Sequence, residues 1–204
     1  MLSSIKLTLR FKTLKKLCIG SGGLALKVIA DINFVRINDK ILIPASTIKG
    51  VLRTSMIKVA PLLGYNVNPT THPTKINDTD NDKIVSLLGK PNKNGKVRLS
   101  SAILDKSTFV LTHVTIDDKC RVANEGNLFS IEYLPKGVEF ISEVKTIDQI
   151  NIDEARLLFA GIMEMNNTRL GKGGLLDIRI KDLDMPDDLK NDKIIKMIME
   201  DIKV

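Results

Sequence analysis

The most informative segment of the chain reads Ile43-Pro44-Ala45-Ser46-Thr47-Ile48-Lys49-Gly50, followed directly by Val51-Leu52-Arg53 and an apolar run. Pro44 disfavours a helix before it, and Ser46 or Thr47 can cap the first free amides of a helix that begins there. Those amides and the helix dipole favour an anion, while Lys49 and Arg53, one turn apart, can share a helix face. The segment therefore predicts a helix start that receives a phosphate group.

A second glycine-bearing cationic segment lies near the other end of the chain, and it reads Thr168-Arg169-Leu170-Gly171-Lys172-Gly173-Gly174. On its own such a segment is typical of an ordinary turn. Paired with the first segment, it predicts that two distant parts of the chain meet in space to hold a sugar-phosphate chain.

Composition favours one domain spanning residues 1–204, since 204 residues with 43% hydrophobic content can build one well-packed core. The net charge of +7 and the pI near 9.4 favour a polyanionic partner such as nucleic acid. Cys18 and Cys120 stand far apart, which excludes a disulfide framework and a zinc knuckle. No apolar run is long enough to cross a membrane, so we expect no membrane partner and a cytoplasmic location.

The periodicity of apolar residues predicts an α+β fold. The predicted strands and helices are a strand over Ser4–Lys12, a helix over Ser46–Leu63 closed by Gly64, a strand over Val97–Leu104, paired strands over Leu128–Glu132 and Val138–Val144, a helix over Asp153–Met165 capped by Asp153, a strand over Leu175–Ile180 and a short helix after Pro186. The order suits a ferredoxin-like or RNA-recognition-motif-like sandwich. Insertions are expected near residues 65–96 and 105–126. The first begins with an exposed loop, and the second is a flexible excursion from the domain.

Together these motifs resemble the RAMP superfamily, the subunits of CRISPR–Cas effector complexes. The segment from Ile43 to Arg53 is similar to its Ile-Pro-Gly-Ser-Ser-Leu-Lys-Gly plus Arg signature, and residues 169–174 are similar to its C-terminal glycine-rich loop. Between them, Leu87-Leu88-Gly89 with Arg98, and the order Ile116-Asp117, Phe129, Glu132, Gly137 and Phe140, also resemble the family. The chain departs from the pattern at Ala45, where glycine is usual, and at Asp118, where arginine is common.

The best match within the superfamily is the backbone subunit of type III complexes, most closely the Csm kind and otherwise the Cmr kind. The resemblance implies a subunit that polymerises with copies of itself along a guide RNA, beside sister subunits, and cleaves single-stranded target RNA at regular intervals. It implies RNA contacts from Ser46, Thr47, Lys49, Arg53, Arg169, Gly171, Lys172, Gly173 and Gly174. Phosphate contacts of this kind do not distinguish one base from another, so they suit a protein that must bind guide RNAs of any sequence. An inserted lid and a thumb that kinks the target are expected within 65–82 or 105–126.

The same resemblance assigns catalysis to Asp31, which stands shortly before the Ile-Pro motif. One carboxylate can hold a hydrated Mg²⁺ or Mn²⁺, because such ions keep several of their waters. An aspartate with a pKa near 4 is a poor general base at neutral pH, so metal holding is the more plausible role. The resemblance thus predicts a metal-dependent endoribonuclease active in the assembled complex.

Two other functions remain open. The same scaffold could bind RNA without catalysis, with Asp31 an inert residue that caps a turn. Alternatively, the chain could be a guide-processing endoribonuclease that needs no metal and uses His72 or His113, which we expect in exposed loops, as acid or base. Metal dependence and periodic product lengths separate these possibilities.

Overall fold

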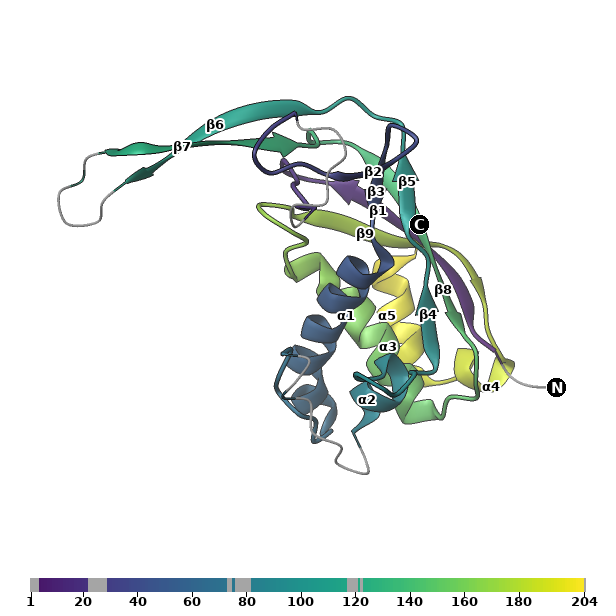
Figure 1. Cartoon of the computed structure of the whole chain (residues 1–204). Coiled ribbons are helices and arrows are strands. Elements are labelled where there is room, and N and C mark those ends of the chain that lie inside the picture. Colours follow the sequence, from purple (N-terminus) through teal and green to yellow (C-terminus); the bar gives the residue numbers. More distant parts are fainter. Residues whose placement is uncertain are drawn as a thin grey trace.

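A four-stranded antiparallel sheet with the order β4-β8-β1-β9 organises the fold (Figure 1). Its strands are β1 (Lys6–Thr13), β4 (Val97–Leu99), β8 (Glu139–Thr146) and β9 (Leu176–Asp184). The structure, a computed structural model, describes residues 4–21, 29–72, 75, 82–116, 121 and 123–203, with the backbone alone described over 123–127. Asp118 and Cys120 lie outside the described residues.

Two helices complete the topology, α1 (Ala45–Val59) after β1 and α3 (Ile152–Glu164) after β8. In chain order the elements run β1-α1-β4-β8-α3-β9, and the central position of β1 between β8 and β9 is that of a ferredoxin-like βαββαβ domain. Figure 1 shows α1, α3 and α5 gathered on one side of the sheet. The predicted α+β, ferredoxin-like fold is confirmed.

The core lies between this sheet and the helices. Leu7, Leu9 and Phe11 alternate inward along β1 as the sequence predicts, and the ring of Phe11 stacks on Phe140 of β8 with centroids 4.8 Å apart. Ile48, Leu52 and Met56 form the buried stripe of α1. The helices pack so closely that a Cβ at Gly161 of α3 would lie 2.5 Å from Met56 Cγ.

Two helix boundaries differ from the sequence prediction. The helix α1 ends at Val59 and continues as a 3-10 turn η1 (Ala60–Leu63) before Gly64, so Leu62, near the end of the predicted helix, is 84% exposed. At α3 the cap is Asn151, not Asp153. Its side chain accepts from the Glu154 amide while the Glu154 carboxylate accepts from the Asn151 amide. This reciprocal capping box satisfies two free amides at once.

The C-terminal segment confirms the predicted amphipathic helix. It contains α4 (Asp187–Lys190) and α5 (Lys193–Ile202), and α5 packs its buried face against α3. That face is formed by Ile195, Ile198, Met199 and Ile202. Asp192 caps α5 and also pairs with Arg156 of α3 at 2.6 Å, so this helix is joined to the body by both apolar and ionic contacts.

A separate three-stranded sheet, in the order β2-β3-β5, lies above α1 in the view of Figure 1. It consists of β2 (Val35–Ile37), β3 (Lys40–Ile43) and β5 (Ala102–Leu104), and the short helix α2 (Lys83–Leu88) precedes β4. The single strand predicted over Val97–Leu104 is therefore wrong. The chain leaves the main sheet at Ser100, whose backbone and side chain both bond to β8, and β5 then pairs with β3.

A two-stranded hairpin, which we call the arm, extends away from the body (Figure 1). It consists of β6 (Phe109–Ile116) and β7 (Ala123–Tyr133), paired antiparallel with each other. This corrects two predictions: much of 105–126 is strand, and Leu128–Glu132 pairs with β6, whereas residues 139–144 of the predicted Val138–Val144 strand lie in β8 and pair with β1. The reason is that β8 already has β1 and β4 as its two neighbours.

Candidate nucleic-acid interface

The helix start predicted to bind phosphate is present, but its capping differs. Pro44 is the N-cap residue, without a side-chain cap, and the Ala45 amide donates to Ser101 Oγ at 3.0 Å. The predicted capping by Ser46 or Thr47 is therefore wrong, because Pro44 places the first turn one residue earlier than expected. Ser101, which is distant in sequence, therefore supplies a hydrogen-bond acceptor for one of the free amides at the start of the helix.

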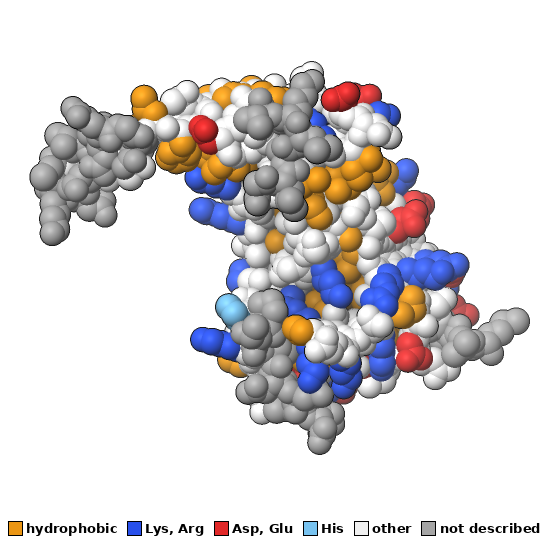
Figure 2. Space-filling model, in the orientation of Figure 1, with side chains coloured by type: hydrophobic (Ala, Val, Ile, Leu, Met, Phe, Trp, Pro, Cys, Tyr) orange, Lys and Arg blue, Asp and Glu red, His pale blue; other side chains and the backbone are white. Residues whose placement is uncertain are grey.

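Three of the four predicted residues of α1 line one pocket, which we call the α1–loop pocket. Ser46, Lys49 and Arg53, together with Gly50, form one wall, and loop residues between Leu88 and Gly95 form another. Its volume is about 350 Å³. Thr47 lies on the same helix but not among the lining residues. Figure 2 shows Lys and Arg side chains gathered over the part of this face where α1 and α2 lie.

The charged side chains among the described lining residues of the α1–loop pocket are all basic. Lys49, Arg53, Lys90 and Lys93 line it, and among the described lining residues there is no Asp or Glu. Burial, followed by the charges of Arg53 and Arg98, lowers the pKa of Lys49. Burial also lowers the pKa of Arg53. Partly buried cations such as these favour a bound anion, which would offset the cost of their burial.

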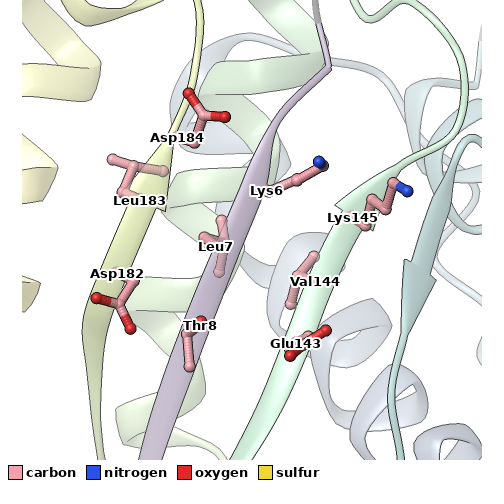
Figure 3. Close-up of a pocket in the computed structure, with 9 residues that line it drawn as sticks. All are labelled: Lys6, Leu7, Thr8, Glu143, Val144, Lys145, Asp182, Leu183 and Asp184. Atoms are coloured by element: carbon pink, nitrogen blue, oxygen red, sulfur yellow. The ribbon is translucent and has the colours of Figure 1, made fainter.

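A second hollow on the main sheet provides a contrast (Figure 3). It lies over β1, β8 and β9, and Figure 3 shows its basic and acidic side chains interspersed on the strands. The charged residues that line it are Lys6, Glu143, Lys145, Asp182 and Asp184. Because the acids outnumber the bases, this surface does not favour a polyanion.

The glycine-rich segment of residues 169–174 packs against the chain that follows β1. The Lys172 amide donates to the Cys18 carbonyl at 2.8 Å and the Cys18 amide donates back to Lys172 at 3.2 Å. Gly171 has φ 57°, and a Cβ there would lie 2.2 Å from the Cys18 carbonyl oxygen. Packing within the protein therefore already requires glycine at this position. The side chains of Arg169 and Lys172 are exposed, whereas Gly174 is buried.

The second cationic segment does not contribute to the α1–loop pocket, because no residue of 168–174 is among its described lining residues. The nearest described link between the two segments is a hydrogen bond of 3.0 Å between Ser55 Oγ on α1 and Thr168 Oγ1, just before Arg169. Lys58 Nζ also lies 3.0 Å from Thr168 Oγ1. The C-terminal half of α1 thus lies beside the glycine-rich segment, while its N-terminal half lines the α1–loop pocket.

Asp31 lies at the root of the arm. Its Oδ2 accepts from the Ser130 amide at 2.6 Å and from the Ser130 hydroxyl at 2.8 Å, and an isolated bridge joins Ile32 to Ile131 of β7. The Asn33 side chain accepts from the amides of Ile29 and Ala30 and shapes this turn. The carboxylate of Asp31 is exposed, and the hydrogen bonds from the Ser130 amide and hydroxyl lower its pKa.

The environment of Asp31 suits a metal held by one protein carboxylate. Among the described residues, no hydrogen bond reaches its Oδ1, and no group of three His, Cys, Asp or Glu could hold an ion together. Mg²⁺ retains several waters and binds through one or two carboxylates. A single carboxylate therefore fits an ion that keeps most of its bound waters, and it does not fit a transition metal held by several protein ligands.

A buried carboxylate beside Asp31 has a structural role that sequence reasoning missed. Glu132 is fully buried, pairs with Arg36 in a bidentate manner, and accepts from the Phe34 amide at 3.0 Å and Thr108 Oγ1 at 2.5 Å. It ties β7 to β2 and to the start of β6. The signal that could have revealed it is an acid placed directly between two apolar residues, Ile131 and Tyr133, which are both buried.

The two histidines lie in different surroundings. His113 is in β6, not in a loop as expected; its ring stacks on Phe129 with centroids 5.5 Å apart, and its Nε2 lies 3.2 Å from the Tyr133 hydroxyl. Lys172 and Lys16 lie over the rings of Phe129 and Tyr133. His72 is exposed in the segment after η1. No described contact joins the two histidines.

Comparison with known proteins identifies the family. A family model described as the RAMP superfamily matches residues 10–174, which include the second half of β1, α1, the arm, α3 and the glycine-rich segment. No curated protein matches the chain. Among the described residues, none of the helices is both long and apolar enough to span a membrane.

Proposed function

The chain belongs to the RAMP superfamily, a family of CRISPR-associated RNA-binding subunits, and from this premise we propose that it is the guide-RNA-binding backbone subunit of a type III effector complex, of the Csm or Cmr kind. It polymerises with copies of itself along the guide, beside other subunits of the complex, and the guide pairs with single-stranded target RNA. Sequence is read by base pairing, so the protein needs only backbone contacts.

The observation that carries this proposal is the α1–loop pocket. Lys49 and Arg53 belong to the segment that resembles the family signature, and they line a concave surface without an acid among its described residues. Phosphate contacts from Lys and Arg supply most of the sequence-independent affinity for nucleic acid. The position of the cations on a rigid helix also fixes the path of the bound strand.

Native mass measurement of the chain mixed with guide RNA tests the proposal. RNA-dependent oligomers are expected for the unaltered chain, and they are expected to disappear when Lys49 and Arg53 are both replaced by Ala. A matched control replaces Lys6 and Lys145, which face each other on β1 and β8 in the mixed-charge hollow. Oligomers that persist after the Lys49 and Arg53 change, or that are lost equally in the control, contradict the proposal.

We further propose that the assembled subunit cleaves target RNA next to Asp31. Cleavage requires activation of a 2′-hydroxyl, its alignment with the scissile phosphate and stabilisation of the leaving oxygen. The lowered pKa of Asp31 keeps its carboxylate ionised at neutral pH, which suits an anchor for Mg²⁺ or Mn²⁺ and not a proton acceptor. Such an ion, when bound, supplies charge stabilisation and an activated water or hydroxyl.

The arm provides a reason for cleavage at this place. Asp31 is held by Ser130 on β7, and the next outward pair on the same face of the arm is Leu128 and Val114, which are 70% and 41% exposed. Because alternate residues of a strand share a face, these apolar side chains lie on the face of the arm that carries the Ser130 hydroxyl bonded to Asp31. They can act as the thumb, unstacking the target strand near Asp31 so that one cut per subunit follows.

A second candidate function is the same RNA-binding scaffold without catalysis. The observation that favours it is the pair of hydrogen bonds from Ser130, which gives Asp31 a structural role in fixing the arm. Cleavage assays on the assembled complex separate the two functions. The third hypothesis, a metal-independent processing nuclease that uses His72 or His113 as acid or base, differs from the first in keeping its activity when divalent metal is removed.

A further inference from the structure

The loop that closes the α1–loop pocket is built as a rigid element. Lys90 and Lys93 exchange two backbone hydrogen bonds of 3.0 Å, with Pro91 and Asn92 between them. Asn92 has φ 67°, the conformation that a type II turn requires at its third position, and Pro at the second position favours the same turn. The two lysines therefore project from a turn whose shape is fixed before any ligand binds.

The ends of the same loop are held against each other and against α1. A Cβ at Gly95 would lie 2.3 Å from the Gly89 amide nitrogen and 2.4 Å from the Leu87 carbonyl oxygen. The guanidinium of Arg53 donates to the Gly89 carbonyl. These contacts set the distance between loop and helix, so the pocket is preorganised and little conformational entropy is lost on binding.

Gly50 lies in the interior of α1 without a packing reason for being glycine. A Cβ built there meets no atom within 4 Å, although glycine inside a helix is less stable than alanine. Gly50 also lines the α1–loop pocket. A bare backbone on a pocket wall allows a ligand to approach the helix closely.

The acid whose charge acts on Arg53 is itself engaged elsewhere. This acid is Asp82; its Oδ1 accepts from the amides of Ile84 and Val85 and its Oδ2 accepts from Asn68, so it is committed to capping α2. The pocket volume of about 350 Å³ is near the lower end of the range of roughly 300–1,000 Å³ for small-ligand sites. That space suits a single phosphate with its ribose.

We propose that the loop from Gly89 to Gly95 is the second wall of the RNA site, so that a ribose-phosphate unit of single-stranded RNA lies against Gly50 with Lys49 and Arg53 on one side and Lys90 and Lys93 on the other. The proposal rests on the proposed function, and it adds the loop lysines and Gly50 to the residues that hold the strand. Their role is to fix where the strand bends over α1.

Binding of a fluorescently labelled oligouridylate, followed by anisotropy at a series of KCl concentrations, tests this proposal. The full chain is compared with the variant Lys90→Ala/Lys93→Ala and with the equally charged control Lys6→Ala/Lys145→Ala. Removing one lysine–phosphate interaction makes the slope of log K against log salt less steep by about 0.7, so the loop variant is expected to change it by about 1.4. The control is expected to retain the slope of the unaltered chain.

The variant Gly50→Ala provides a second, independent readout. Its melting temperature is expected to rise, because alanine favours the helix and meets no neighbour, while its affinity for the same oligouridylate is expected to fall. Opposite changes in stability and affinity distinguish a ligand contact from a folding defect. Unchanged affinity at a raised melting temperature removes Gly50 from the site.

The outcomes separate this proposal from the proposed function. If Lys49→Ala/Arg53→Ala weakens binding and the loop variant does not, the loop is not a wall of the site and the RNA-binding function stands. If the unaltered chain fails to bind the oligouridylate even at low salt, both are rejected. Equal losses in the loop variant and the sheet control also reject the loop, because they indicate net charge alone.

Discussion

Asp31 receives two hydrogen bonds from a single residue, since its Oδ2 lies 2.6 Å from the backbone nitrogen and 2.8 Å from the hydroxyl oxygen of Ser130. The contact joins the turn before β2 to the arm. It gives the same carboxylate a structural role and the proposed catalytic role, and substitutions must be chosen to separate them.

The substitution Asp31→Asn separates the two roles. Asparagine keeps an oxygen that accepts from Ser130 but loses the negative charge that would hold a cation. In the assembled complex we expect guide and target binding to persist and target cleavage to be lost, as measured by denaturing gels of labelled target RNA. Asp31→Ala is expected to lose cleavage and also to loosen the arm, which amide exchange of β7 reports. Cleavage at the unaltered rate by Asp31→Asn would exclude this carboxylate from the reaction.

The substitution Ser130→Ala is expected to raise the pKa of Asp31 toward its ordinary value. The Ser130 hydroxyl bond is removed while the amide bond remains, and both lower this pKa in the native protein. Because the pKa of Asp31 is lower in the folded protein than in the unfolded chain, where it is near 4, this carboxyl adds to the free energy of unfolding above about pH 4. That contribution is lost as the pH falls through the pKa of the folded state. Carboxyl ¹³C titration by NMR measures the change; an unaltered titration midpoint would contradict the assigned cause.

The buried pair of Arg36 and Glu132 is expected to be sensitive to single substitution. Burial alone would raise the pKa of Glu132, but the hydrogen bonds from Arg36, Thr108 and Phe34 outweigh it and lower the pKa. Arg36→Ala leaves a buried carboxylate without its cation and should cost about 3–5 kcal/mol in the free energy of unfolding. Urea denaturation measures it. The double variant with Glu132→Leu should recover part of the loss, whereas additive losses would indicate that the pair does not interact.

The substitution Gly171→Ala is expected to destabilise the fold whether or not RNA is present. The new Cβ would meet the Cys18 carbonyl, and φ 57° strains a residue with a side chain. Such strain costs of the order of 1–3 kcal/mol, measured as a lower free energy of unfolding. Gly137→Ala, at φ 88° but with nothing within 4 Å of its Cβ, is the control that carries backbone strain without the clash. Equal losses in both variants would show that packing against Cys18 contributes nothing.

Sequence patterns predicted most elements whose apolar periodicity is strong. The alternation of Leu7, Leu9 and Phe11, and the helical spacing of Ile48 and Leu52, each indicate one buried face, and local geometry links spacing to face directly. The strand predicted over Leu128–Glu132 lies in β7 of the arm, but β6 was missed because none of its residues is buried, so its alternation carries a weak core signal. The arm's partner choice depended on β8 already having two neighbours, which no local pattern reveals.

The sequence predicted which residue types form the candidate site, but it predicted only part of how these residues are placed relative to one another. Lys49 and Arg53 line one pocket, as helical spacing implies, but the 88–95 loop that completes it is distant in sequence. The glycine-rich segment lies beside the other half of α1. The glycine at position 171 is explained by the Cys18 carbonyl oxygen, which would clash with any Cβ there, and only the folded chain creates this approach.

The order of the residues alone determined the fold class, the helix that bears the cations, the basic charge and the family resemblance, because these follow from periodicity, composition and contiguous motifs. Only the tertiary structure decided which cations share a pocket, that Asp31 is held by Ser130 at the root of the arm, and that Glu132 is buried against Arg36. The physical reason is that these contacts join residues that lie dozens to about a hundred positions apart in the chain. Closing such a long loop costs conformational entropy, and only the packing of the whole core offsets that cost.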